Sequence, residues 1–160
     1  TTVICHDWRV MHGLPEGADS RLQIDLGNIR QPVKVRFEPD HLRRVLINLL
    51  DNANRHGSGE VGSVEVRVRH QPQAGGPGQL VLSVLNDGDT ISPETERALF
   101  EPFFSTRSRG TGLGLYICRE LCERHGASID YRQHLAPARH HNEFLVMIPA
   151  LPETTAGLSA

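Results

Sequence analysis

Alternation of apolar and polar residues along the chain predicts several short strands. The clearest is 64–68, where three valines alternate with a glutamate and an arginine. Residues 80–85 are more continuously apolar, which predicts a central strand. Between them, residues 71–78 carry two prolines and three glycines, so we expect a hairpin loop there. The other strands are expected at 22–26, 33–37, 128–132 and 143–148.

A three-to-four-residue apolar period predicts helices elsewhere. The strongest is 40–56, with Asp40 as its N-cap and an end near Gly57. Its apolar stripe is formed by Leu42, Val45, Leu46, Leu49, Leu50 and Ala53. A second amphipathic helix is expected at 112–125, and shorter ones at 1–12 and 93–100.

Strands and helices do not alternate in a βαβ rhythm, which favours an α+β domain. We expect one mixed sheet with helices on one face. The predicted organisation is the end of a preceding linker or helix at 1–20, one folded domain at 21–150 and a small, polar tail at 151–160.

Composition narrows the classes of function. A net charge of −2 over 160 residues provides no basic surface for nucleic acid or an anionic membrane. No apolar run approaches the roughly 20 residues that a membrane span needs. Three cysteines fit a reducing compartment, so we expect a cytoplasmic domain. Because the first residue is Thr1, we expect a fragment of a longer protein whose membrane anchor could lie outside it.

Three alternating glycines at 110–115 lead directly into the helix expected at 112–125. Glycine lets the backbone approach a ligand closely, and a helix N-terminus directs free N–H groups at an anion. No Walker lysine follows these glycines. The pattern predicts a phosphate cradle of another kind.

Polar residues also line one stripe of the helix expected at 40–56. Asn48, Asn52 and Arg55 fall at i, i+4 and i+7, and His56 follows directly. Carboxamide oxygens suit Mg²⁺, while arginine and histidine can donate to phosphate. The alternative is a solvated polar face with an arginine matched to the helix dipole.

Two further segments carry candidate chemistry. Asn86-Asp87-Gly88 follows the expected central strand and could be no more than a turn. Residues 99–109 place three phenylalanines before the glycines, which suggests a mobile cover whose Arg107 and Arg109 meet phosphates when it closes.

In this order, the four segments resemble the N, G1, F and G2 boxes of bacterial sensor histidine kinases, within the superfamily of gyrase B, Hsp90 and MutL. The resemblance covers residues 20–150. The glycine segment and the short cover resemble the nitrogen-regulation branch and, within it, the type IV pilus sensor kinases. The resemblance implies a two-layer α/β sandwich with a mostly antiparallel sheet, the Bergerat fold, that binds ATP and Mg²⁺.

The resemblance also implies roles for residues. Asn52 would be the Mg²⁺ ligand, with Asn48 assisting, and Arg55 and His56 would contact phosphates or ribose. Residues 100–109 would form the ATP lid. The implied nucleotide-binding set is Asn48, Asn52, Arg55, His56, Asn86, Gly88, Ile91, Phe100, Arg107, Arg109, Gly110, Thr111, Gly112, Leu113, Gly114 and Leu115.

Some positions depart from the family pattern. Asn86 stands where a carboxylate normally reads adenine; its side-chain oxygen could still accept from the adenine amino group, with binding weaker by roughly 1 kcal/mol. Thr90 replaces a usual glycine, which would stiffen the loop. The stretch before the last strand lacks the usual glycines, and we expect His140 and His141 there to be exposed.

In the hydrolytic relatives of this superfamily, a glutamate of the N box activates water. Asn48 stands at the matching position, and it has no titratable group and cannot be a general base. The implied acceptor is therefore a histidine on a separate dimerisation and phosphoacceptor domain, with a response regulator as the partner of the parent protein. His6 begins a short match to such an acceptor motif, but Val10 and Met11 break the motif. No catalytic residue is assigned within the chain. The alternatives are a degenerate nucleotide sensor, an anti-sigma-type serine kinase and a hydrolytic ATPase.

Overall fold

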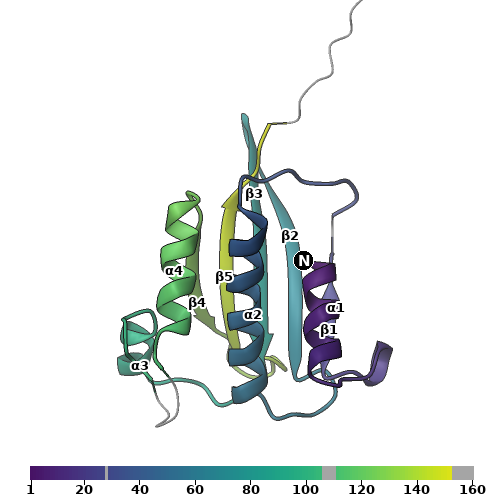
Figure 1. Cartoon of the computed structure of the whole chain (residues 1–160), viewed down its shortest axis with the longest axis vertical. Helices are drawn as coiled ribbons and strands as arrows, with labels where there is room; N and C mark the ends of the chain where they lie inside the picture. Colours follow the sequence, from purple (N-terminus) through teal and green to yellow (C-terminus); the bar gives the residue numbers. More distant parts are fainter. Residues whose placement is uncertain (28, 106–110, 153–160) are drawn as a thin grey trace, which may run out of the picture.

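One five-stranded sheet with helices across one face forms the fold (Figure 1). The structure is a computed structural model and describes residues 1–27, 29–105 and 111–152. The helices are α1 (Thr2–Met11), the 3-10 helix η1 (Gly17–Asp19), α2 (Pro39–His56), α3 (Pro93–Ala98) and α4 (Gly114–Arg124). The strands are β1 (Leu22–Asp25), β2 (Val64–Gln73), β3 (Gly76–Asn86), β4 (Ser128–Gln133) and β5 (Asn142–Pro149).

The sheet order is β1-β2-β3-β5-β4, with β1 parallel to β2 and every other pair antiparallel. This confirms the expected α+β class, the mixed, mostly antiparallel sheet and the central position of the apolar strand. In the β3–β5 register, Asn86 lies opposite Asn142. These two residues therefore meet at the end of the sheet where α2 ends and α4 begins (lower end in Figure 1).

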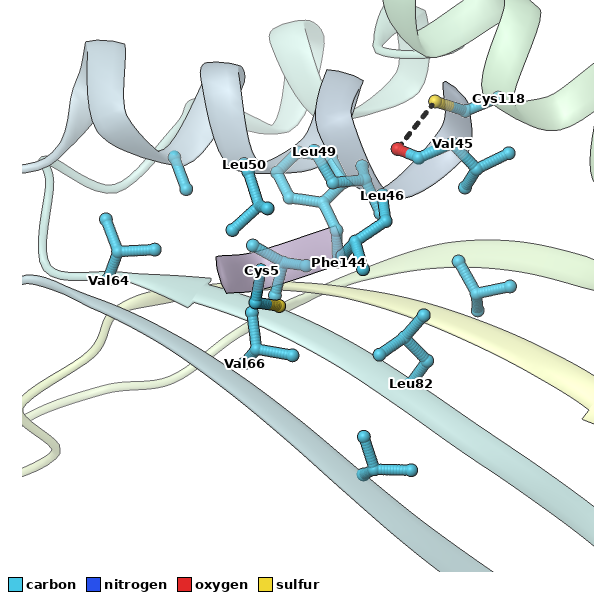
Figure 2. Packing of buried hydrophobic residues seen from close by; sticks show 14 of the residues in the cluster. Cys5, Val45, Leu46, Leu49, Leu50, Val64, Val66, Leu82, Cys118 and Phe144 are labelled. Carbon is cyan, nitrogen blue, oxygen red and sulfur yellow. Dashed lines mark hydrogen bonds between the residues drawn. The ribbon is translucent and has the colours of Figure 1, made fainter. Parts of the chain in front are cut away.

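The core lies between α2 and the sheet (Figure 2). Val45, Leu46, Leu49 and Leu50 are fully buried on the sheet-facing side of α2. Valines of β2 meet them from below, because every second side chain of a strand points to the same face. Burial of this stripe fixes how α2 is rotated and so which of its polar residues face away from the core.

α1 joins the same core through Cys5 and Trp8, which are 0% and 1% exposed. The Trp8 indole N–H donates to Asp51 Oδ1 of α2 at 2.7 Å. Residues 1–20 thus include a helix that is packed on the domain, while the boundaries at 20 and 150 stay predictions. Among the described residues, no helix is both long and apolar enough to traverse a bilayer.

The structure corrects three local expectations. Residues 33–37 form no strand: their only bridge joins Val35 to Ala150, because the segment crosses the end of the sheet toward α2 instead of running beside a strand. The N-cap of α2 is Glu38, not Asp40, since the Glu38 carboxylate accepts from the backbone N–H groups of Asp40 and His41. The expected 71–78 loop is a tight hairpin, with Gln73 paired to Gly76.

Candidate functional site

A cavity of about 300 Å³ opens between the end of α2, the start of α4 and the adjoining end of the sheet. Its walls combine polar residues of α2 with apolar residues near α3, α4 and the sheet. The lining residues are Asn48, Asp51, Asn52, Arg55, His56, Asn86, Asp89, Ile91, Thr95, Leu99, Phe104, Ser105, Thr111, Gly112, Gly114, Leu115, Tyr131, Asn142 and Phe144. Most of the sequence-predicted site residues are in this set, so the fold brings residues of all four motifs to one place.

Other predicted residues lie elsewhere. Phe100 packs edge-on against Phe144, with ring centroids 6.3 Å apart, and does not line the cavity. Gly88 lies in the buried turn after Asn86, and Leu113 lines a second, more open cavity beside α4. Arg107, Arg109 and Gly110 lie outside the described residues, as does the part 106–109 of the expected cover.

The polar wall of the cavity follows from the packing of α2. Its apolar stripe faces the sheet, so Asn48, Asn52 and Arg55 lie on the adjacent face and line the cavity. Asn48 also reaches α4: a Cβ on Gly114 would lie 3.6 Å from Asn48 Oδ1. This arrangement argues against a merely solvated polar face and sets two carboxamide groups opposite the start of a helix.

The opposite wall is the N-terminal end of α4. Its N-cap, Leu113, supplies no side-chain hydrogen bond to the first turn, so the free N–H groups of that turn are not satisfied by a cap. Gly112 has a left-handed φ of 67°, and a Cβ there would lie 2.4 Å from the Phe103 carbonyl carbon. The helix end therefore offers donors and a positive partial charge to an anion in the cavity.

A buried hydrogen-bond network forms the sheet end of the cavity. Asn86 Oδ1 accepts from the Gly88 N–H at 3.0 Å and from Asn142 Nδ2 at 3.1 Å. Tyr131 Oη donates to Asn142 Oδ1 at 2.6 Å. Burial raises the pKa of Tyr131, which keeps the phenol protonated as a donor. The oxygen expected to meet adenine is thus turned into the protein.

Sequence reasoning missed Asn142 and Tyr131. Each lies in a strand whose pattern indicated only a closing element of the sheet. The one available signal was an asparagine at the start of an otherwise apolar strand. Its significance depends on the β3–β5 register, which a single sequence does not provide.

The histidines before β5 are a correction. His140 and His141 are half-buried, not exposed. His140 Nε2 lies 2.8 Å from the Gly62 carbonyl oxygen, and His141 Nδ1 lies 3.2 Å from that of Gly88. The expectation that these two side chains are exposed is wrong, because both contact backbone carbonyl groups of the neighbouring turns at the start of β5.

The turn after β3 is tied to the end of α2. Asp87 accepts from the Ser58 backbone N–H at 2.8 Å and from its hydroxyl at 2.7 Å. Gly88 packs so closely that a Cβ there would lie 2.2 Å from the His56 carbonyl oxygen. The Asn-Asp-Gly segment is therefore a turn held in one position against the cavity, as well as a turn signal.

The donor set limits how a metal could bind. Within the described residues, no three histidine, cysteine, aspartate or glutamate side chains are grouped to hold a metal ion. Mg²⁺ commonly takes only one or two protein ligands together with substrate phosphates. Asn48 and Asn52 fit that mode and would not fit a dedicated protein cage.

Comparison with known proteins agrees with this geometry. The sensor protein kinase PilS of Pseudomonas aeruginosa is 42% identical over 119 residues, which are 71% of this chain and 21% of PilS. The sensory histidine kinase/phosphatase NtrB of Escherichia coli O157:H7 is 32% identical over 121 residues, 72% of this chain and 34% of NtrB. The structure of the mycobacterial sensor histidine kinase MprB has a TM-score of 0.71 at 24% identity, covering 94% of this chain and 95% of that one.

The two-layer fold, with the polar face of α2 opposite the glycine-rich start of α4, is that of a class of ATP-binding domains. The chain belongs to the histidine kinase-, DNA gyrase B- and HSP90-like ATPase family, whose model matches residues 37–152. The family resemblance predicted from the sequence is confirmed, and the relatives include PilS and NtrB. The chain spans about a fifth of the length of PilS and about a third of the length of NtrB.

Proposed function

We propose that this chain is the catalytic domain of a two-component sensor histidine kinase. It binds ATP with Mg²⁺ and presents the γ-phosphate to a histidine on a separate dimerisation and phosphoacceptor domain outside the chain. The observation that carries the proposal is the cavity in which Asn48 and Asn52 face the uncapped start of α4. The similarity to PilS and NtrB supports the kinase reading.

The cavity suits a nucleotide on structural grounds. Its volume of about 300 Å³ lies at the small end of ligand sites, which is compatible with an open site that encloses part of its ligand. Its polar lining includes Arg55 and the N–H donors at the start of α4, both suited to phosphate. Its apolar lining includes Ile91, Leu99 and Phe144, whose surfaces suit a planar base.

Asn52, with Asn48 beside it, would hold Mg²⁺ through carboxamide oxygens. The bound metal would neutralise charge on the phosphates during transfer. Asn48 cannot take a proton from water, which favours transfer to a side chain over hydrolysis. The contribution of this chain is then positioning and charge stabilisation, which are the main terms in phosphoryl transfer.

The parent protein would pass the phosphoryl group to a response regulator. We place this domain in the cytoplasm, with any membrane anchor elsewhere in the parent protein. The described surface provides no reason to invoke nucleic acid, since the net charge is −2.

Phosphorylation of the parent protein tests the proposal. We expect the full-length kinase to form acid-labile, base-stable phosphohistidine with radiolabelled nucleotide, and Asn52→Ala to abolish it. Nucleotide binding without any phosphohistidine would favour the degenerate sensor. Steady release of phosphate by the isolated domain would favour a hydrolytic ATPase.

A further inference from the structure

The side-chain amide of Asn86 has an orientation that the surrounding backbone determines. A backbone N–H can only donate, so the Asn86 atom 3.0 Å from the Gly88 nitrogen must be the oxygen. The same oxygen accepts from Asn142 Nδ2 at 3.1 Å, which uses its second lone pair. The nitrogen of Asn86 must then point the other way.

Asn142 cannot turn over to release this arrangement. Its nitrogen also lies 3.1 Å from each of the carbonyl oxygens of Gly88 and Asp89, so its two hydrogens are shared among three acceptors, and carbonyl oxygens can only accept. Its oxygen accepts from the Tyr131 hydroxyl. Reversal of Asn86 would set a donor against the Gly88 N–H, and reversal of Asn142 would set an acceptor against the carbonyl oxygens of Gly88 and Asp89; both clashes at buried positions are costly.

The Asn86 amide nitrogen is therefore the polar group left for a ligand. Among the described residues, no hydrogen bond involves this nitrogen. It is also not fully buried, because the fully buried side-chain nitrogen and oxygen atoms without a hydrogen-bond partner among those residues are Arg9 Nε and Ser63 Oγ. Asn86 is 1% exposed and lines the cavity, so its small accessible surface opens there. A base that enters this end meets a hydrogen-bond donor.

Purine bases differ at the position that such a donor would read. Adenine carries an amino group at C6, which donates, whereas guanine and hypoxanthine carry a carbonyl oxygen, which accepts. A donor opposite the adenine amino group is unsatisfied, and a donor opposite O6 forms a hydrogen bond. Asp89 lines the same cavity and has a carboxylate that could accept from the N1–H of a 6-oxopurine.

We propose that this site accepts 6-oxopurine nucleoside triphosphates, GTP or ITP, at least as tightly as ATP, and that Asn86 determines the preference. The inference rests on the proposed function, in that the cavity must bind a purine nucleotide. Replacement of the donor–donor contact between Asn86 and the adenine amino group by a hydrogen bond to O6 should change nucleotide affinity by about tenfold.

Calorimetric titration of the chain with Mg²⁺ and the imido analogues of ATP, GTP and ITP tests the proposal. We expect GTP and ITP analogues to bind as tightly as the ATP analogue or tighter. In Asn86→Asp, whose carboxylate only accepts, the ratio of GTP to ATP affinity should fall about tenfold or more. Asn52→Ala, which acts at the phosphate end, should weaken all three and leave the ratio unchanged.

A comparison of nucleotides with different bases, all titrated into the unaltered protein, tests the proposal without requiring that a variant folds. Purine riboside triphosphate, which has no group at C6, should bind more tightly than ATP and more weakly than ITP. A tenfold or greater preference for ATP in the unaltered chain, or a ratio that Asn86→Asp leaves in place, would overturn this inference while the proposed function stands. No binding of any triphosphate at millimolar concentration would overturn the proposed function as well.

Discussion

Phe103 and Gly112 contact each other through their backbones, close enough that a Cβ on Gly112 would lie 2.4 Å from the Phe103 carbonyl carbon. Both residues have left-handed backbones, with φ of 63° and 67°. A residue with a side chain rarely adopts such an angle without strain. Phe103 adopts it although its side chain is 78% exposed, so burial of the ring does not explain the backbone conformation. The phenylalanine segment thus lies directly on the residue that leads into α4, so the two motifs form one structural unit.

Gly112→Ala should disturb this unit and with it the start of α4. The added methyl group would meet backbone, which cannot move as a flexible side chain can, and the left-handed angle adds roughly 1–2 kcal/mol of strain. We expect a lower melting temperature and a loss of nucleotide affinity of about tenfold or more, measured by calorimetry.

Gly126→Ala is the matched control, because Gly126 has the same φ of 67° but nothing within 4 Å of its Cβ position. It should share the strain and keep the affinity. Equal losses of affinity in the two variants would mean that contact with Phe103 is irrelevant to the site.

Asn52→Ala should remove the dependence of nucleotide affinity on Mg²⁺. The lost carboxamide oxygen is the proposed metal ligand, so titrations with and without Mg²⁺ should converge. Asn54→Ala makes the same change two residues further along α2, where Asn54 accepts from Arg21 at 2.9 Å. That control should lose some stability and keep its response to Mg²⁺; a retained response in Asn52→Ala would refute the assignment.

Trp8→Phe should destabilise the domain by about 1–2 kcal/mol in urea unfolding. The ring still fills most of the buried site, but Asp51 loses the indole donor at 2.7 Å. In a double-mutant cycle with Asp51→Ala, the two effects should be non-additive because the residues share one hydrogen bond. Additive effects would show that α1 is held by packing alone.

Stability should fall in alkaline solution through the buried thiols. Burial raises the pKa of Cys118 to about 12 from 9.0, so the folded state keeps a proton that the unfolded state releases. The contribution is complete below pH 9 and is lost as the pH rises toward 12. Cys118 also donates from its thiol to the Val45 carbonyl oxygen (Figure 2).

Urea unfolding at several pH values from 7 to 11 checks this. The stability difference between the unaltered chain and Cys118→Ala should narrow as the pH rises. A constant difference would mean that Cys118 titrates alike in the folded and unfolded states.

Local patterns predicted the parts of the fold that local physics decides. Alternating valines in β2 and the apolar stripe of α2 each specify one buried face, and both were predicted correctly. Residues 33–37 alternate in the same way but form no strand, because pairing requires a neighbour at the right place and only Val35 meets one. The N-cap was misplaced by two residues because Glu38, Pro39 and Asp40 are all plausible at a helix start.

The site was predicted where motifs carry its residues and missed where the fold assembles them. Asn48, Asn52 and Asn86 stood out because asparagine is unusual in a helix and marks turns after strands. Asn142 and Tyr131 come from strands that join Asn86 only through the sheet order. The direction of the Asn86 amide follows from those partners, so the sequence could suggest the wrong atom for the base.

Titration of the isotope-labelled chain with a non-hydrolysable ATP or GTP analogue and Mg²⁺ tests whether this cavity binds a nucleotide. We predict saturable binding at millimolar concentration or below, with the largest amide shifts at Asn52, Asn86 and Gly114, the residues that line the cavity. Absence of binding for both analogues, or shifts confined to residues away from the cavity, would mean that this cavity is not a nucleotide site.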